Sequence, residues 1–252
     1  MKVVIIGGAG YIGSHVVLDA IERGYDITVF DDLSTGHKEN INEKVQFIHG
    51  STLSISDLSK LFTARRYDAV VHLAASKAAG ESMLEPAIYA RNNIIGGQNV
   101  INACSDFNIK IIIFSSSAAV YGVPKCKLIN EHHPLYPTNY YGQTKLHVEE
   151  SLKWFSKLKG IKYASLRYFN AAGYDLQKRI KSLESNPQNL IPKVMEVASG
   201  RKKQVAVYGN DVAKEISRSI NKFKIIITKS TVPVTTGDKI EKILASKHNK
   251  KK

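Results

Sequence analysis

Cysteine is scarce in this sequence, and long apolar runs are absent. Only two cysteines, Cys104 and Cys126, occur in 252 residues, so a disulfide framework is not expected and a reducing, cytoplasmic location is the default expectation. No apolar run approaches the roughly 20 residues that a membrane-spanning helix needs. Glycines interrupt the short apolar run at the amino terminus, which argues against a signal peptide. No membrane partner is therefore expected.

Acidic residues are outnumbered by basic ones, 22 against 36, which gives a formal net charge of +14. Such an excess can indicate a nucleic-acid partner. Here residues 212–252 hold eleven Lys and Arg against three Asp and Glu, and the chain ends in KHNKKK. A short basic stretch of this kind is more typical of a solvated chain end. Nucleic-acid binding is therefore not expected, and residues 247–252 are predicted to be a basic, disordered tail.

Short β-branched runs alternate with amphipathic stretches along the chain, which is typical of a parallel sheet covered by helices. All-apolar runs such as VVIIG and IIIF fit strands that are buried on both faces. The pattern predicts an α/β fold with a doubly wound parallel sheet. Strands are expected at 2–6, 26–31, 45–49, 69–73, 110–115 and 162–168, and helices at 11–23, 55–63, 87–105, 138–158 and 189–199.

A glycine-rich turn follows the first predicted strand. Gly7, Gly10 and Gly13 form a G-x-x-G-x-x-G pattern, and Gly8 offers the alternative reading G-x-G-x-x-G. The early glycines allow a tight turn and close approach of the backbone to a pyrophosphate. The last one lets helix and strand pack closely, and the helix N-terminus favours negative charge. The order strand, motif, helix predicts an NAD-binding Rossmann fold.

Asp31 ends the second predicted strand, near the spacing expected for the residue that binds the adenosine ribose. Its carboxylate suits the two ribose hydroxyls of NAD and would repel the 2′-phosphate of NADP. No Lys or Arg follows before Lys38. NAD is therefore the expected cofactor. The competing interpretation is that Asp31 only caps a loop.

Three serines end the fifth predicted strand, and a Tyr-x-x-x-Lys pair follows. Tyr141 and Lys145 are four residues apart, so on a helix they share a face. A lysine in that position is expected to lower the pKa of the tyrosine from its reference value of about 10. A serine hydroxyl from the strand end can bind the same substrate oxygen. Together these groups could take a proton from an alcohol while hydride leaves its carbon.

In this order the segments resemble those of the UDP-glucose 4-epimerases, within the extended short-chain dehydrogenase/reductase family. The matching stretches include GGAGYIGSH (7–15), FSSSAAVYG (114–122), YYGQTKLHVE (140–149) and LRYFNAAG (166–173). The resemblance continues through VAVYGND (205–211) and implies one NAD-binding domain over residues 1–211. Related dehydratases usually carry Thr-Asp-Glu where this chain has Ser115-Ser116-Ser117, which argues against dehydration.

The resemblance also implies roles for individual residues and a UDP-sugar as the substrate. Tyr141 would take the proton of the sugar 4-hydroxyl while hydride passes to the nicotinamide. The 4-keto sugar would then turn over and receive hydride on its other face, which interconverts UDP-glucose and UDP-galactose. No metal is implied, and a homodimer is compatible with the resemblance. The catalytic residues would be Ser117, Tyr141 and Lys145; NAD would contact Gly7, Gly10, Tyr11, Ile12, Gly13, Asp31, Asp32, Lys77, Asn92, Tyr141, Lys145 and Tyr168; the nucleotide sugar would contact Ser117, Phe169, Asn170, Asn189 and Leu190.

Two departures from the family pattern bear on activity. Ser51 stands where the family has an Asp that contacts the adenine. The loss of one hydrogen bond to a charged acceptor should weaken cofactor binding by about 1.5–3 kcal/mol. After residue 211 the family continues into a C-terminal substrate domain. Residues 212–246 instead resemble a helix–strand–helix piece of UDP-glucose 6-dehydrogenase that includes KSTVPV (229–234). We therefore expect a truncated or replaced substrate domain, a loosely attached appendage and weakened turnover.

Three functions stay open on the sequence. The first is NAD-dependent interconversion of UDP-glucose and UDP-galactose, which the intact Ser, Tyr and Lys set favours. The second is a catalytically inactive NAD-binding remnant or fusion product, which the replaced C-terminal segment favours. The third is another nucleotide-sugar epimerase of the same family.

Overall fold

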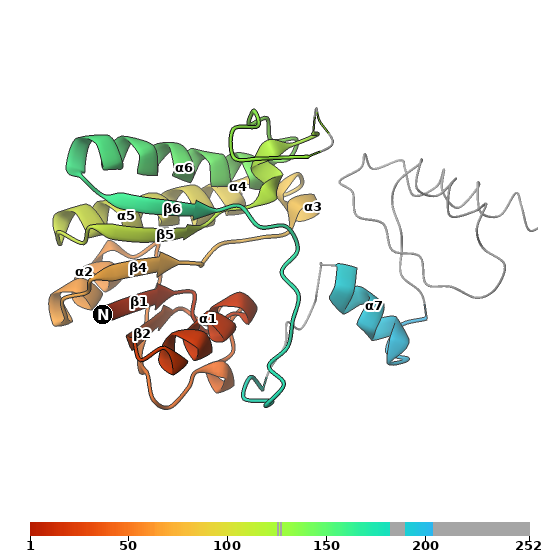
Figure 1. The fold of residues 1–252 in the computed structure, drawn as a ribbon, viewed down its shortest axis with the longest axis horizontal. Coiled ribbons are helices and arrows are strands. Elements are labelled where there is room, and N and C mark those ends of the chain that lie inside the picture. Colours follow the sequence, from red (N-terminus) through yellow and green to blue (C-terminus); the bar gives the residue numbers. More distant parts are fainter. Residues whose placement is uncertain (125, 127, 182–189, 204–252) are drawn as a thin grey trace, which may run out of the picture. The chain divides into compact units, whose positions relative to one another are not determined.

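The computed structural model describes residues 1–124, 126, 128–181 and 190–203. Within these residues six parallel strands form one sheet in the order β3-β2-β1-β4-β5-β6 (Figure 1). The predicted doubly wound α/β fold is confirmed, and the first two strands have the predicted limits, whereas each of the others differs at one end by one or two residues. The strands are β1 (Lys2–Ile6), β2 (Asp26–Asp31), β3 (Gln46–His49), β4 (Ala69–His72), β5 (Ile111–Ser115) and β6 (Lys162–Leu166).

Helices connect the strands, and most of them lie where the amphipathic pattern predicts. The helix expected at 87–105 consists of α4, a π-helical turn η2 and α5 in succession. Helix α3 escaped prediction because four residues are too few to show a helical period. The elements are α1 (Tyr11–Glu22), η1 (Lys38–Asn40), α2 (Ile55–Ala64), α3 (Ala79–Ser82), α4 (Pro86–Tyr89), η2 (Ala90–Ile95), α5 (Gly96–Asp106), η3 (Ala118–Tyr121), α6 (Tyr140–Lys159) and α7 (Leu190–Ala198).

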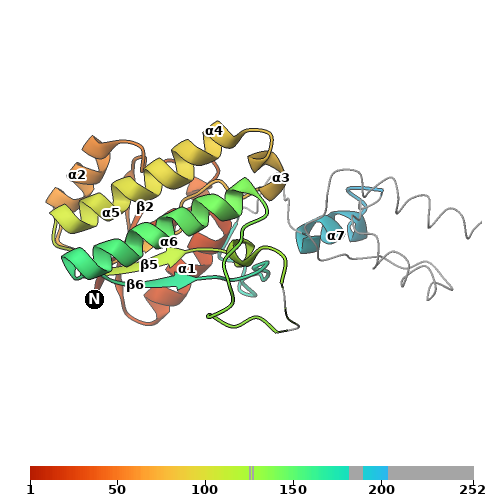
Figure 2. The ribbon, with the colours of Figure 1, turned by 90° about the horizontal axis from the view of Figure 1, so that it is seen from above.

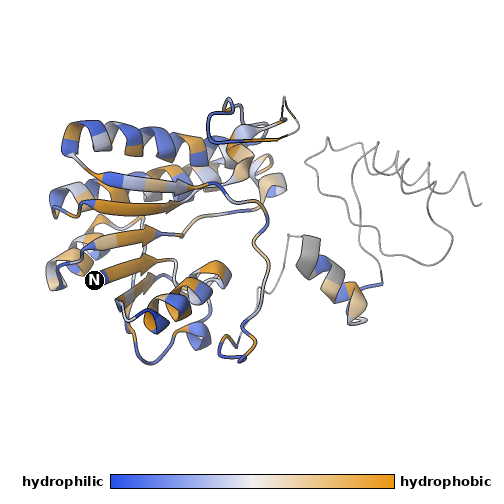
Figure 3. Ribbon diagram, viewed as in Figure 1, coloured by the Kyte–Doolittle hydropathy of each residue, from blue (hydrophilic) through white to orange (hydrophobic). Residues whose placement is uncertain are grey.

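Alternate residues of each central strand are buried under different helices. In β1, Val4 and Ile6 belong to a core that includes residues of α2, α5 and α6. Val3 and Ile5 belong to a second core with Val17 of α1. Figure 2 shows α2, α5 and α6 on one side of the sheet and α1 on the other. Because both faces of the strands are covered, these strands are almost uniformly apolar, as the colouring of Figure 3 shows.

The sheet reverses its winding at β1, which pairs with β2 on one side and with β4 on the other. The connection from β1 leads to α1 on one face, and later connections lead to the helices on the opposite face. In open α/β sheets, ligands bind outside the carboxyl ends of the strands at such a reversal. The fold therefore brings the segments that follow β1, β2, β4 and β5 to one edge.

Helix α6 is positioned by caps at both ends. The Asn139 side chain accepts a hydrogen bond from the backbone N–H of Gly142, at 2.8 Å. Gly160 ends the helix in the left-handed conformation, with φ of 67°, where glycine avoids the clash that a Cβ would cause. The cap at Asn139 fixes where the helix begins, so Tyr141 lies in its first turn and Lys145 one turn later.

The chain divides into two compact units, Met1–Ser185 and Asn186–Lys252. The described part of the second unit is α7 and the turn that follows it to residue 203. The expected domain limit at residue 211, the appendage at 212–246 and the tail at 247–252 lie outside the described residues and stay predictions. Across the described part of the chain, no helix combines the length and the apolar character that crossing a membrane requires.

Candidate active site

The turn after β1 needs glycine at two positions for the packing of the chain itself. Gly7 has φ of +86°, and a Cβ there would lie 2.6 Å from the backbone nitrogen of Ala74. A Cβ on Gly13 would lie 2.1 Å from the carbonyl oxygen of Gly7. Helix α1 therefore approaches the end of β1 more closely than any side chain would permit. Gly8 is also crowded, because its Cβ would lie 2.8 Å from Val29 Cγ1.

Gly10 is different, because the chain's own packing does not require it to be glycine. A Cβ at Gly10 would have the Gly7 carbonyl oxygen, 3.5 Å away, as its only near neighbour, and that is an ordinary contact. Gly10 is also the N-cap of α1; it has no side chain that could accept from the first-turn N–H groups, and the first turn of α1 holds no acidic residue. Open space before an uncapped helix start fits a bound pyrophosphate.

Asp31 lies at the carboxyl end of β2, with 8% of its surface exposed. Its carboxylate accepts hydrogen bonds from the backbone N–H groups of Ala9 and Leu33, both at 2.9 Å. Burial raises the pKa of this carboxyl, and the two N–H groups oppose the rise. Asp31 thus does hold the glycine-rich loop, as the competing interpretation required. Each carboxylate oxygen keeps a lone pair that a ribose hydroxyl could use, so the two roles are compatible.

Asp32 and Ser51 meet beyond the ends of β2 and β3. The Ser51 hydroxyl lies 3.4 Å from Asp32 Oδ2, and the Ser51 N–H donates to Asp57 Oδ2 at 3.3 Å. Asp32 is exposed. The serine that replaces the family's aspartate therefore lies beside a carboxylate, so this corner keeps one exposed acidic side chain.

Ser115, which ends β5, and the two serines that follow it face different partners. The Ser115 carbonyl accepts from Lys145 Nζ at 2.9 Å, and its hydroxyl meets the Tyr168 hydroxyl. The Ser116 hydroxyl points the other way and donates to buried Glu149. Alternation along an extended chain explains the difference. It also returns Ser117 to the side of Tyr141, where its hydroxyl partly opposes the rise that burial causes in the pKa of Tyr141.

Tyr141 and Lys145 come together as the i, i+4 spacing predicts, but the pKa of Tyr141 differs from the expectation. Lys145 Nζ lies 5.8 Å from the centre of the Tyr141 ring and 5.0 Å from that of Phe114. Burial lowers the pKa of Lys145 to about 7. The pKa of Tyr141 is raised, because burial outweighs the opposing effect of the Ser117 hydroxyl. The expected lowering by Lys145 is therefore wrong for the chain by itself, since the lysine is buried as deeply as the phenol.

The loop after β4 is tied to the catalytic helix through the π-helical turn. Asn92 Nδ2 donates to the Ser76 hydroxyl at 2.9 Å. Asn93, which the sequence interpretation passed over, donates to the Ser76 carbonyl and to the Thr144 hydroxyl, both at 2.9 Å. A single π-turn inside a helix is itself a frequent marker of functional sites. Lys77, next to Ser76, is exposed.

The remaining predicted site residues are placed unevenly. Tyr168 follows β6 and reaches the serine run, and burial raises its pKa. Phe169 and Asn170 come directly after it and are exposed. Tyr11 donates from its hydroxyl to the Gly173 carbonyl at 2.5 Å, and Ile12 is half-buried beside it. Asn189 lies outside the described residues, and Leu190 begins α7 in the second unit.

Two residues of the α3–α4 region support Tyr141 and were not predicted. The buried Ser82 hydroxyl accepts the Tyr141 backbone N–H at 3.0 Å. The Tyr89 ring stands edge-on to the Tyr141 ring, with centroids 6.5 Å apart. Its hydroxyl lies 2.8 Å from the Ala78 carbonyl oxygen and 2.7 Å from Glu81 Oε2 and shares its one proton between these two acceptors. Burial raises the pKa of Tyr89. In the sequence these contacts correspond only to the run GES (80–82) and a tyrosine at 89. That stretch shows no helical periodicity, so the pattern did not link Ser82 or Tyr89 to Tyr141.

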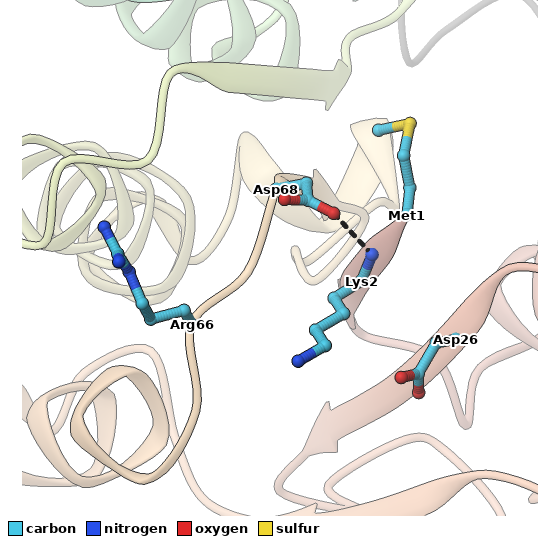
Figure 4. Close-up of a pocket in the computed structure, with 5 residues that line it drawn as sticks. All are labelled: Met1, Lys2, Asp26, Arg66 and Asp68. Atoms are coloured by element: carbon cyan, nitrogen blue, oxygen red, sulfur yellow. Dashed lines mark hydrogen bonds between the residues drawn. The ribbon is translucent and has the colours of Figure 1, made fainter.

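An open hollow of about 510 Å³ lies at the opposite, amino-terminal edge of the sheet (Figure 4). It is lined by Met1, Lys2, Asp26, Arg66 and Asp68. Asp68 Oδ2 accepts the Lys2 backbone N–H at 2.7 Å. This edge is not where α/β sheets bind their ligands, so the carboxyl edge is the candidate active site. In the described residues, no group of three or more His, Cys, Asp or Glu side chains could hold a metal ion.

Comparison with known proteins agrees with this geometry. Residues 3–216 match the NAD dependent epimerase/dehydratase family. The chain is 41% identical over 215 residues to a UDP-glucose 4-epimerase of Halalkalibacterium halodurans, and the aligned residues make up 85% of this chain. The chain spans 64% of that relative's length.

Solved structures give the same likeness. The UDP-glucose 4-epimerase of Brucella ovis, in complex with NAD, has a TM-score of 0.80 at 40% identity, over 83% of this chain and 64% of that one. The enzyme of Bifidobacterium longum, with NAD⁺ and UDP, has a TM-score of 0.79 at 32% identity, over 84% of this chain and 66% of that one.

Proposed function

The chain belongs to the NAD dependent epimerase/dehydratase family, and on that premise we propose that it interconverts UDP-glucose and UDP-galactose by epimerisation at sugar C4. The observation that carries the proposal is the meeting of Ser117, Tyr141 and Lys145 from two elements, the end of β5 and the first turns of α6. NAD is the cofactor of the family. The Gly10 space, the uncapped start of α1 and the Asp31 carboxylate fit it.

NAD, when bound, supplies reversible hydride acceptance. The residues of the chain handle the proton. Tyr141 exchanges a proton with the sugar 4-hydroxyl, and the Ser117 hydroxyl, which lies on the same side of the strand end as Tyr141, binds the same oxygen and relays that proton. The phenolate form of Tyr141 is favoured when Lys145 beside it is charged. Because burial lowers the pKa of Lys145 to about 7, its charge changes near neutral pH.

The substrate and the partners are proposals drawn from relatives that are longer than this chain. The Bifidobacterium longum structure contains UDP, which supports a UDP-sugar here. Phe169 and Asn170, exposed after Tyr168, are proposed to contact it, with Asn189 and Leu190. The family match reaches residue 216 and does not test the rest of the chain. The likeness of 212–246 to UDP-glucose 6-dehydrogenase therefore stays a prediction. A homodimer and a cytoplasmic location stay predictions as well.

A coupled assay tests the proposal. The full chain, supplied with NAD and UDP-galactose, should form UDP-glucose. Added UDP-glucose dehydrogenase then oxidises the UDP-glucose, and the NADH that this step forms is measured. Tyr141→Phe serves as the blank and should lower kcat by about 100-fold or more, because it removes a general acid–base group. Turnover that survives in Tyr141→Phe would contradict the assignment of the proton-transfer residue.

Two other outcomes separate the alternatives. Tight NAD binding without turnover of any UDP-hexose would support an NAD-binding protein that is not an enzyme. Turnover of UDP-N-acetylglucosamine at a higher kcat/KM than UDP-glucose would assign the chain to another nucleotide-sugar epimerase. Isothermal titration with NAD and parallel assays of the two sugars decide between these outcomes.

A further inference from the structure

A partly buried ion pair, whose carboxylate is buried and whose guanidinium is half-buried, follows the catalytic residues on α6 and has no part in the reaction described above. Glu149 stands one helical turn after Lys145 on α6, with 6% of its surface exposed. Arg167, directly after β6, donates from Nε to both carboxylate oxygens at 3.0 and 3.1 Å, and from Nη2 to Oε2 at 2.5 Å. A paired guanidinium and carboxylate with this many hydrogen bonds is held in one geometry.

Ser116 joins this pair to the serine run. Its hydroxyl, in a buried residue, donates to Glu149 Oε1. Ser116 stands between Ser115, whose carbonyl accepts from Lys145, and Ser117, which meets Tyr141. Fixing the side chain of Ser116 therefore fixes the backbone that presents both neighbours. Arg167 in turn donates to the Tyr121 hydroxyl at 3.2 Å, which anchors the far side of the pair.

The charges around Lys145 come from three elements. Strand β5 contributes a neutral carbonyl and an aromatic ring, and β4 contributes His72, which burial keeps neutral by lowering its pKa to about 3. Helix α6 contributes a phenol and the carboxylate of Glu149, which raises the pKa of Lys145 against the effect of burial. The described groups that face Lys145 are Phe114, Ser115, His72, Tyr141 and Glu149. Of these five, Glu149 is the one with a negative charge.

We propose that Glu149 is a positioning residue of the active site: held by Arg167 and Ser116, it favours the charged form of the buried Lys145 and fixes the strand end that carries Ser117. Its consequence for turnover rests on the proposed epimerase function, but its effect on Lys145 does not. A solely structural ion pair would stabilise the fold and leave the ionisation of Lys145 unchanged. The two interpretations therefore differ in a measurable quantity.

The direct test is an NMR titration of Lys145 in the full chain without ligand. Lysine labelled with ¹³C at Cε reports deprotonation, and the Lys145 signal is the one lost in Lys145→Arg. In Glu149→Gln the pKa of Lys145 should fall by about one unit or more, because a nearby opposite charge has been removed. Glu150→Gln is the matched control, since Glu150 is the next residue of α6 and is exposed, and it should leave the titration unchanged.

A second variant keeps the test decisive if Glu149→Gln does not fold. Removing one partner of a buried pair leaves the other charge unpaired, whereas replacing both partners is often tolerated. Glu149→Gln combined with Arg167→Met should therefore fold. Since Glu149 is the charge that acts on Lys145, the pKa of Lys145 should fall in this variant too. An unchanged pKa of Lys145 in whichever of these variants folds overturns the proposal.

Turnover gives an independent readout. In the pH profile of kcat/KM, the alkaline limb of Glu149→Gln should move to lower pH by the same interval as the NMR titration, while Glu150→Gln keeps the wild-type limb. If wild-type protein does not convert UDP-galactose, the proposed function fails, and the titration of Lys145 still decides the role of Glu149. A limb that stays in place while the pKa of Lys145 falls would show that the charge of Lys145 does not govern the reaction, and would overturn the positioning role.

Discussion

Alanine substitutions at three glycines should separate packing of the fold from binding of NAD. A Cβ at position 13 would lie 2.1 Å from the Gly7 carbonyl oxygen and 2.7 Å from Gly8 Cα. Both neighbours are backbone atoms, which cannot rotate away. Overpacking costs typically 1–3 kcal/mol and sometimes more, so Gly13→Ala should lower the free energy of unfolding by about 3 kcal/mol or more.

Gly10→Ala should behave in the opposite way. Gly10 has φ of −74°, which alanine adopts freely, and its Cβ would be 3.5 Å from the nearest atom. Loss of the small N-cap preference of glycine over alanine costs less than about 1 kcal/mol. The methyl group would occupy the space assigned to the pyrophosphate. Losing one hydrogen bond to a charged phosphate costs about 1.5–3 kcal/mol, so the Kd for NAD should rise by about 10- to 150-fold.

Gly24→Ala supplies the control. Gly24 follows α1, has φ of +77°, and has no atom within 4 Å of its Cβ position. Alanine there pays about 1–2 kcal/mol for the left-handed conformation, with no effect on NAD. Urea unfolding gives the free energies, and isothermal titration gives the Kd for NAD. An unchanged Kd in Gly10→Ala, or a Gly13→Ala variant as stable as wild type, would refute the reasoning.

Three further substitutions test single contacts. Asp31→Asn should raise the Kd for NAD about tenfold or more and reduce the preference for NAD over NADP, because the ribose loses a charged acceptor. If the wild type binds NADP more tightly than NAD in the same isothermal titration, the role given to Asp31 is wrong. His72 is buried with its pKa lowered from 6.5 to about 3, so the unfolded chain binds its proton first and stability falls as pH drops through this window, by about 1.4 kcal/mol per unit. His72→Asn should reduce that slope in urea unfolding at successive pH values, and an identical slope would show that His72 does not cause the acid sensitivity. Arg179→Ala should speed hydrogen exchange at 175–181 alone, since Arg179 joins Asp175 to Glu22; unchanged exchange there would mean that the ion pairs do not hold the segment.

The sequence was sufficient for the strands and for most helices, because burial on both faces leaves a local signature. Val3 to Ile6 are apolar without alternation, and that is what a strand under helices on both sides requires. The i, i+4 spacing of Tyr141 and Lys145 likewise needed only a helix to bring the two side chains together. The π-helical turn Ala90–Ile95 was not predictable in this way, and its Asn93 bonds to Thr144, 51 positions along the chain, a contact that no local pattern shows.

The ionisation of the site also escaped the sequence. A lysine four residues from a tyrosine suggests a lowered tyrosine pKa, yet the pKa of Tyr141 is raised. The spacing says nothing of how much water either group retains, and desolvation is the largest cause acting on both Tyr141 and Lys145. That quantity depends on Phe114 of β5 and His72 of β4, which come to lie beside Lys145 only after the sheet has formed.

What the sequence by itself determined is the order of the elements, the glycine turn, the ribose carboxylate and the chemical types of the reacting groups, since each depends on residues near one another in the chain. What the tertiary structure decided is which of three adjacent serines faces Tyr141, which faces Glu149, and that Arg167 holds Glu149 in place. These contacts join β5, α6 and the residue after β6. Their geometry is set by the register of a parallel sheet, and no local pattern encodes that register.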